Sequence, residues 1–172
     1  MANFEIERKY LIRKKDIEFD LKQFKHKKIV QGFIYLKPAI RVRKYGDKYY
    51  FAIKSKAPKK YDKFDDLIRT EYEIEIDEKA YKYLLKCCAG RIIYKTRYFI
   101  PYKSQNRQYT IELDIFEKDL KGLIYAEIEF KNLKEASNIV VPGWFYKDIT
   151  NIEKYKNTQL SICKNIKNVL KY

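Results

Sequence analysis

The sequence predicts an α+β fold in which a closed, eight-stranded antiparallel β-barrel carries helices on its outside. Three observations support this prediction. Eight segments alternate apolar and polar residues at the period of a strand, whereas only a few have the apolar spacing of a helix. The pair Gly46-Asp47 between two of these segments is a hairpin turn signal. No linker or repeat interrupts the 172 residues, so we expect one domain over residues 1–172.

The expected strands share short alternating patterns bounded by turn residues. They cover residues 4–12, 29–36, 40–45, 48–55, 67–76, 91–101, 108–116 and 124–132. Between the fourth and fifth strands, residues 57–66 hold Pro58 among several lysines and aspartates. This composition fits either a loop at the mouth of the barrel or a plain surface loop.

Three amphipathic helices are expected to cover the barrel. Asp16 caps the first, Asp77 caps a second that ends at Gly90, and the third covers residues 158–170. Their apolar residues recur at i, i+3 and i+4, which places them on one face. A further short helix is expected at residues 134–139.

The polar faces of the strands are sorted by charge. The wholly acidic pairs are Glu112 with Asp114 and Glu127 with Glu129, and the basic positions are Arg41, Arg43, Lys54, Lys95 and Arg97. Two further strands carry both signs, as Glu5, Glu7 and Lys9 and as Arg69, Glu71 and Glu73. A solvent face usually mixes charges, so the sorting favours a barrel with its charged face inside and its apolar face under the helices. The alternative is an ordinary barrel or sandwich with an apolar interior.

The composition excludes several classes of protein. Hydrophobic residues make up 46% of the chain, too many for a disordered chain. The net charge of +15 comes from scattered lysines without a nucleic-acid-reading motif, so we expect a surface that steers anions and no specific nucleic acid partner. Without a signal peptide or a membrane-spanning apolar run, no membrane partner is expected.

Cysteine and histidine usage narrows the chemistry further. The three cysteines lack metal-binding spacing and are expected to be reduced, as in a cytoplasmic protein. His26 is the only histidine and lies in a lysine run, which argues against a Ser-His or Cys-His mechanism. A catalytic base would then be a carboxylate, a lysine, a tyrosine or a metal-bound hydroxide.

Paired carboxylates and paired cations point to a particular kind of ligand. Glu5 and Glu7 are spaced i, i+2 on one strand face and repel each other unless a cation joins them. A divalent cation suits that need, because hard cations prefer carboxylate oxygens. The basic strands would hold a multiply charged anion, and polyphosphate with a divalent metal combines both.

The charged pairs also carry a family resemblance. In the order of these pairs along the sequence, the chain resembles the triphosphate tunnel metalloenzymes, or CYTH superfamily. This superfamily includes class IV adenylate cyclase and thiamine triphosphatase. The matching segments are Glu5-x-Glu7-x-Lys9, Gln31-Gly32-Phe33, Arg41-x-Arg43, Lys54, Arg69-x-Glu71-x-Glu73, Lys95-x-Arg97 and the run from Gly122 to Glu129. The match departs from the family pattern where Phe145-Tyr146 replaces the usual Leu-Gly.

The resemblance implies metal-dependent hydrolysis of inorganic tripolyphosphate or of an organic or nucleoside triphosphate inside the tunnel. One or two Mg²⁺ or Mn²⁺ ions are expected on Glu5, Glu7, Asp114, Glu127 and Glu129, with Glu71, Glu73 and Glu112 as further possible partners. The expected phosphate-binding residues are Lys9, Arg41, Arg43, Lys54, Arg69, Lys95 and Arg97. Lys9 and Lys54 are expected to be catalytic. Ion pairing among Arg69, Glu71 and Glu73 themselves is the structural alternative for those three.

Two other functions stay open at this point. A class IV adenylate cyclase has the same fold but attacks the α-phosphate with a ribose hydroxyl, and no adenine pocket can be recognised in the sequence. A non-catalytic polyphosphate- or nucleotide-binding module would gain nothing from so many carboxylates. The sequence does not indicate the oligomeric state.

Overall fold

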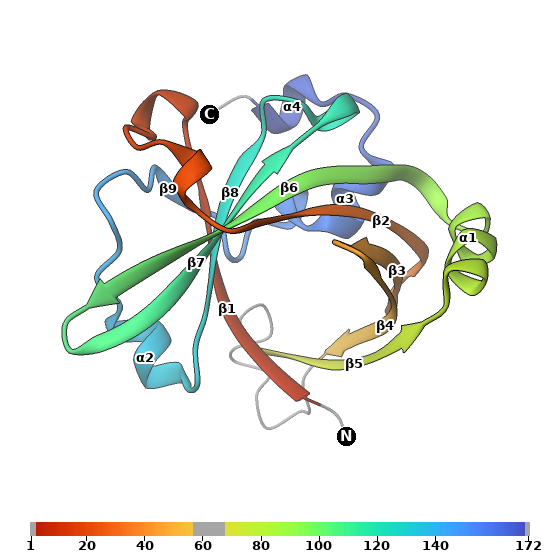
Figure 1. Ribbon diagram of the computed structural model, residues 1–172, viewed down its shortest axis with the longest axis horizontal. Helices are drawn as coiled ribbons and strands as arrows, with labels where there is room; N and C mark the ends of the chain where they lie inside the picture. The colour runs from red at the N-terminus through yellow and green to blue at the C-terminus, as the bar shows by residue number, and fades with distance from the viewer. Residues whose placement is uncertain (1–2, 57–67, 171–172) are drawn as a thin grey trace.

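The computed structural model describes residues 3–56 and 68–170, and its main feature is a strongly curled antiparallel sheet (Figure 1). The sheet has nine strands in the order β5-β4-β3-β2-β6-β7-β8-β1-β9. The strands are β1 Asn3–Leu11, β2 His26–Leu36, β3 Ala39–Tyr45, β4 Lys48–Lys56, β5 Ile68–Ile76, β6 Ala89–Ser104, β7 Arg107–Phe116, β8 Ile124–Glu129 and β9 Lys147–Asp148. All eight predicted strands are present, with ends that shift by a few residues.

Strand β1 divides its pairing between two neighbours. Residues 7–11 pair with β8, whereas residues 3–6 pair with β5. The first strand of the sheet order, β5, and the seventh, β8, therefore meet at β1. The prediction of an antiparallel sheet with helices is confirmed, but the closed eight-stranded barrel is not: β9 adds a ninth strand, and the sheet is not fully closed, since only residues 3–6 of β1 pair with β5. The two residues of β9 are too few to show any alternation in the sequence.

The helices are α1 Glu78–Lys86, α2 Leu133–Asn138, α3 Asn157–Ile162 and α4 Lys167–Leu170. Helix α1 begins as predicted, because the Asp77 carboxylate accepts a hydrogen bond of 2.8 Å from the backbone N–H of Ala80. It lies against the outer side of β2–β4 (Figure 1). Gly32 on β2 permits this approach, since a Cβ at that position would lie 2.6 Å from the Cys88 sulfur.

Three helix predictions need correction. No α-helix follows Asp16, because its carboxylate bonds to Arg13, and two short 3₁₀ turns, η1 Lys14–Asp16 and η2 Leu21–Gln23, form there instead. Gly90 does not end α1: the helix ends at Lys86, and Gly90 is the second residue of β6, with a φ of +73°. The C-terminal helix predicted for residues 158–170 is split into α3 and α4.

The inner face of the sheet is charged in one part and apolar in another. Leu11, Phe33, Ile93 and Tyr125 point to the same side as the charged residues and are buried against the C-terminal segment, which contributes Leu160 from α3. A second cluster covers the outer face of β1, β7 and β8, where Tyr10 and Ile128 are buried. Phe145, in the segment that departs from the family pattern, packs its ring 4.7 Å from that of Tyr10.

Two further observations complete the fold. The turn between β3 and β4 contains Gly46 at a φ of +62°, as the Gly46-Asp47 hairpin signal predicts. Residues 57–66, expected as a loop, lie outside the described part of the chain. Within the described residues, no helix is both long and apolar enough to span a membrane.

Candidate active site

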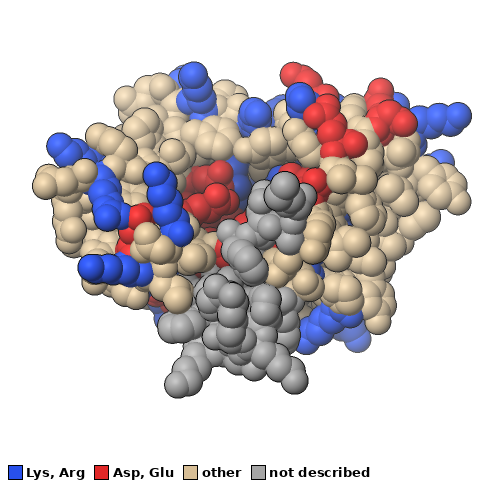
Figure 2. All heavy atoms as spheres, turned by 90° about the horizontal axis from the view of Figure 1, so that it is seen from below, with Lys and Arg blue, Asp and Glu red and all other residues tan. Residues whose placement is uncertain are grey.

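The charged part of the inner face borders a cavity of about 220 Å³. Figure 2 looks into this hollow, with acidic side chains at its centre and basic ones beside them. The predicted site residues in its lining are Glu5, Glu7, Lys9, Arg41, Arg43, Lys54, Glu71, Lys95, Arg97, Glu112, Glu127 and Glu129. They come from seven strands, and alternation at a period of two brings each side chain to the inner face.

Three predicted residues are placed differently or cannot be placed. Asp114 is fully buried behind the lining, and Glu73 also lies outside it. Arg69 belongs to β5, but its side chain is outside the described part of the structure. The lining therefore holds most, but not all, of the charged residues that the sequence groups together.

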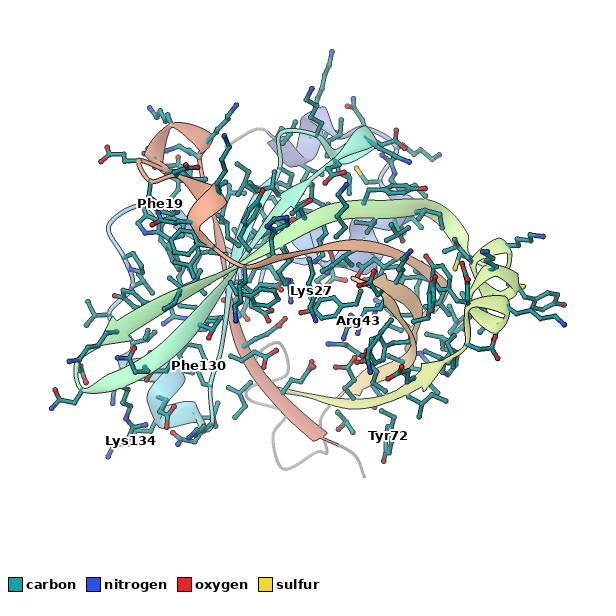
Figure 3. The ribbon with its side chains drawn as sticks, in the orientation of Figure 1. Phe19, Lys27, Arg43, Tyr72, Phe130 and Lys134 are labelled. Carbon is teal, nitrogen blue, oxygen red and sulfur yellow. The ribbon has the colours of Figure 1, made fainter. Side chains whose placement is uncertain are left out.

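On the β3–β5 wall the charges compensate one another. Arg41 donates from one guanidinium nitrogen to Glu71 at 2.7 Å and to Glu73 at 3.1 Å, while Arg43 contacts Glu73 at 2.8 Å. Figure 3 shows Arg43 inside the curl of β2–β5. These arginines are positioned by register, since β3 and β5 both pair with β4. Glu71 and Glu73 thus act as ion-pair partners of Arg41 and Arg43, whereas the expected alternative paired them with Arg69, whose side chain is outside the described residues.

Lys54 joins this wall to β1. Its ammonium lies 2.5 Å from Glu5 and 3.1 Å from Glu71. Burial and the neighbouring Glu71 raise the pKa of Glu5, whereas the pKa of Glu71 is lowered despite its burial, by its contacts with Glu5, Lys54 and Arg41. Within this carboxyl pair, Glu71 is therefore deprotonated more readily than Glu5.

The opposite wall is organised around Arg97 on β6. Its guanidinium contacts both oxygens of Asp114 at 2.6–2.7 Å, Glu127 at 2.5 Å, and Glu112. Lys95 also contacts Asp114. Both oxygens of Asp114 are therefore occupied by Arg97 and Lys95, which explains why this carboxylate does not face the cavity.

Glu127 is the most strongly ionised of the cavity carboxylates. Burial alone would raise its pKa, but Lys9, Arg97 and Lys95 outweigh burial and hold the pKa well below its usual range. Lys9 in turn lies 2.8 Å from Glu127, and the pKa of its ammonium is raised because Glu127 and Glu7 overcome the effect of burial.

The negative charges of Glu129 and Glu7 are compensated by far fewer nearby cations than the charge of Glu127. Among the described residues Glu129 forms no ion pair, and Glu7 has only Lys9 at 3.9 Å. Burial, followed by the nearby Glu112, Glu5 and Glu7, raises the pKa of Glu129 to about 7. This edge of the cavity therefore carries excess negative charge next to a wall of cations.

The acidic edge fits a divalent cation in its chemistry. Carboxylate oxygens are the preferred ligands of Mg²⁺ and Mn²⁺, and a cation would relieve the repulsion that raises the pKa of Glu129. In the described part of the chain, however, no three Asp, Glu, His or Cys side chains lie close enough to coordinate one ion as they stand. An ion held by one or two of these carboxylates would complete its coordination with water or phosphate oxygens.

Sequence reasoning missed several lining residues. Gln31 and Tyr45 line the cavity beside the arginines, and Thr150, Lys156, Asn157 and Thr158 come from the C-terminal part of the chain. Gln31 could have been found, because a glutamine between Ile29 and Phe33 on an otherwise apolar strand face is unusual. The four C-terminal residues follow no pattern that places them at the sheet.

Comparisons with known proteins agree with this arrangement. The sequence model of the CYTH domain family matches residues 3–150. An inorganic triphosphatase of Nitrosomonas europaea is 33% identical over 123 residues, 72% of this chain and 74% of that protein. An inorganic triphosphatase of Acetivibrio thermocellus is 32% identical over 133 residues, 76% of this chain and 77% of that protein.

Solved structures are similar as well. A crystal structure of an inorganic triphosphatase superposes with a TM-score of 0.62 at 28% identity, covering 92% of this chain and 94% of the other. A putative adenylyl cyclase from Hippeastrum, described as having a dominant triphosphatase activity, superposes with a TM-score of 0.53 and covers 77% of this chain and 82% of its own. At 15% identity, this second likeness shows the fold alone.

Proposed function

The chain belongs to the CYTH domain family, and from this premise we propose that it is a metal-dependent triphosphatase. It hydrolyses a phosphoanhydride bond of a triphosphate, with inorganic tripolyphosphate as the first candidate because both curated relatives are inorganic triphosphatases. One observation carries the proposal: cations from four strands and an excess of carboxylates line a single cavity.

The cations bind the phosphate chain. Arg41 and Arg43 on β3, Lys54 on β4, and Lys95 and Arg97 on β6 line different parts of the wall. Arginines form two parallel hydrogen bonds to phosphate oxygens, whereas lysines act as point charges. Arg69 is proposed as a further binding residue on its position in β5 alone. The charged groups orient the chain and compensate its charge, which is the main requirement of phosphoryl transfer.

Glu5, Glu7, Glu127 and Glu129 are the residues that would hold one or two Mg²⁺ or Mn²⁺ ions. When bound, such an ion neutralises phosphate charge and helps to supply the attacking water. The position of Glu129 supports this assignment, because it lines the cavity with Glu5, Glu7 and Glu127, and after burial the carboxylates of Glu112, Glu5 and Glu7 contribute to its raised pKa. Asp114 is better suited to positioning Arg97 and Lys95, since both its oxygens already bind them.

Lys9 and Lys54 are the proposed catalytic cations. Each contacts a carboxylate that is proposed to hold metal, Lys9 at Glu127 and Lys54 at Glu5. Each can therefore turn from that carboxylate to a phosphate oxygen when the carboxylate changes partner. An ammonium group in contact with the leaving phosphate stabilises the negative charge that develops on it as the bond breaks.

Two structural proposals belong with this function. The eight long strands would act as the wall of a closed tunnel, supported by the pairing of β1 with both β8 and β5. Residues 1–172 would form one CYTH-like domain.

One experiment separates the proposed function from its alternatives. Purified protein is incubated with Mg²⁺ or Mn²⁺ and tripolyphosphate, ATP or thiamine triphosphate, and both phosphate and cyclic AMP are measured. Phosphate release is the expected result. Cyclic AMP from ATP would identify a cyclase instead, and binding without either product would identify a polyphosphate- or nucleotide-binding module.

A further inference from the structure

The cavity wall formed by β2 and β3 contains buried donors that have no acceptor. Among the described residues, the side-chain nitrogens without a hydrogen-bond partner include Nε of Arg41, Nε of Arg43 and Nε2 of Gln31. All three residues line the cavity. Buried polar groups in folded proteins are nearly always paired, so three unpaired donors on one wall call for an explanation.

The three side chains are neighbours on one face. Gln31 on β2 is the register partner of Arg43 on β3, and Arg41 lies two residues further along β3. Side chains of register partners lie about 5 Å apart, within reach of a single phosphate group. Gln31 is 1% exposed, so bulk water does not reach its Nε2 in the ligand-free structure, and a contact with a cavity ligand requires the amide to turn toward the cavity.

The surroundings of Gln31 decide what could pair with it. On its other side β2 pairs with β6, where Ile93 lies opposite Gln31 and Lys95 lies opposite the preceding inward residue, Ile29. Its polar neighbours on these strands are thus Arg43 and Lys95, which are donors and cannot accept its hydrogen bond. The missing group is an acceptor that these strands do not supply. The cavity lining also contains an acceptor without a partner, Oδ1 of Asn157, but it is neutral, and next to two cations an anion is favoured.

We propose that Gln31 is a substrate-binding residue, which donates a hydrogen bond from Nε2 to a non-bridging phosphate oxygen. A phosphate oxygen offers several lone pairs and carries the charge that Arg41 and Arg43 attract. A metal ion cannot fill this position, because an N–H group donates and does not ligate. The proposal rests on the proposed function and extends the phosphate-binding wall from β3 to β2.

The neutral side-chain amide of Gln31 would orient a phosphate oxygen through a hydrogen bond and would add no charge to the wall. A lysine at position 31 would increase the repulsion among the neighbouring cations before substrate binds, whereas a carboxamide does not. Gln31 therefore determines the position of a phosphate oxygen, whereas Arg41 and Arg43 supply the electrostatic attraction for the phosphate. In the free protein, the cost of this arrangement is an unpaired buried donor.

The test uses Gln31→Met, which keeps the length of the side chain and removes its polar atoms. In the substrate-free protein with chelator, the variant should melt at the same temperature as the wild type or a higher one, because an unpaired buried group has been removed. Its affinity for tripolyphosphate, measured under the same conditions by calorimetry, should fall about tenfold. With Mg²⁺, kcat/KM should fall by a similar factor. The matched control is Gln108→Met, at an exposed position of β7, which should change neither property.

The outcomes separate this inference from the proposed function. A less stable Gln31→Met protein with unchanged tripolyphosphate affinity would overturn the inference, because Gln31 would then serve only packing. If that variant does not fold, Gln31→Glu is the second test: its carboxylate should pair with Arg43 and weaken tripolyphosphate binding more than tenfold, and unchanged binding would again overturn the inference. A wild-type protein that neither binds tripolyphosphate in chelator nor hydrolyses it with Mg²⁺ would overturn the proposed function together with this extension of it.

Discussion

Lys9 on β1 and Glu127 on β8 are register partners, and they form an ion pair of 2.8 Å in the cavity lining. Lys54 and Glu5 form a similar pair at 2.5 Å. In the ligand-free structure, the cations proposed to bind phosphate and the carboxylates proposed to bind metal therefore neutralise one another. If the proposed roles hold, each carboxylate would exchange its ammonium for metal, and each ammonium would be released to phosphate. Each ligand would then favour the binding of the other.

The first prediction concerns Glu129, the cavity carboxylate without an ion-pair partner among the described residues. In metal-free protein at pH 8, Glu129→Gln should raise the unfolding free energy by about 1 kcal/mol, because it removes a repelled charge that is partly screened by water. With Mg²⁺ present, the same variant should lose metal affinity and most of its turnover. Thermal melting with chelator and phosphate release with Mg²⁺ measure the two effects.

The control for this prediction is Glu18→Gln, an exposed glutamate away from the cavity, which should leave stability and turnover unchanged. A Glu129→Gln protein that turns over tripolyphosphate at the wild-type rate would remove Glu129 from the metal site. Glu7→Gln tests the second weakly compensated carboxylate in the same way.

The second prediction concerns Arg43. Its ion-pair partner Glu73 keeps Arg41 as a second partner, so Arg43→Ala should leave the protein folded. The loss of one charge-assisted contact to phosphate should lower kcat/KM for tripolyphosphate by roughly ten- to hundredfold. Arg107→Ala, which breaks an exposed pair with Glu135, should change kcat/KM less than twofold. A change below twofold in Arg43→Ala as well would place Arg43 outside the binding site.

How far the sequence predicts this site depends on which property is considered. Alternation at a period of two assigns Glu5, Arg41 and Glu127 to the inner face correctly, since that property belongs to each strand alone. It does not reveal which charges meet, because cross-strand register is set by the whole sheet. For this reason Asp114 was expected at the cavity, although Arg97 and Lys95 occupy both its oxygens. Contacts from α3 are harder still, because its docking depends on apolar packing far along the chain.

The third prediction concerns the structural role that Arg97 has in addition to its proposed contact with phosphate. Arg97 joins Asp114, Glu112 and Glu127, so Arg97→Met leaves buried carboxylates with fewer partners. We expect a loss of about 3–5 kcal/mol in unfolding free energy, far more than for Arg43→Ala. Urea denaturation of both variants under the same conditions measures the difference. Equal stability of the two proteins would show that Arg97 does not hold the β6–β8 wall together.

The fourth prediction concerns the metal requirement. Chelator should abolish hydrolysis, and Mg²⁺ or Mn²⁺ should restore it, because the carboxylates of the acidic edge cannot compensate phosphate charge by themselves. Ca²⁺ should bind and inhibit, since it takes more ligands at longer distances than Mg²⁺. Phosphate release is followed with each ion added to chelated protein. Full activity in excess chelator, or with Ca²⁺ alone, would refute the proposed metal chemistry.

The last prediction is a preference for tripolyphosphate over pyrophosphate. The cations lie on separate strands, with Arg41 and Arg43 on β3, Lys54 on β4 and Lys95 on β6, so a single terminal phosphate cannot reach them all. A three-phosphate chain contacts more of them while its oxygens also meet metal held by the acidic edge. Pyrophosphate leaves some of these cations without a phosphate partner.

Binding of the distal phosphate should also help to align the bond that breaks, so the shorter substrate is expected to lose turnover as well as affinity. The measurement compares phosphate release from the two substrates at equal metal concentration. If pyrophosphate were hydrolysed as fast as tripolyphosphate, the separate strands of cations would not be acting on one substrate chain, and the cavity would not be built for three phosphates.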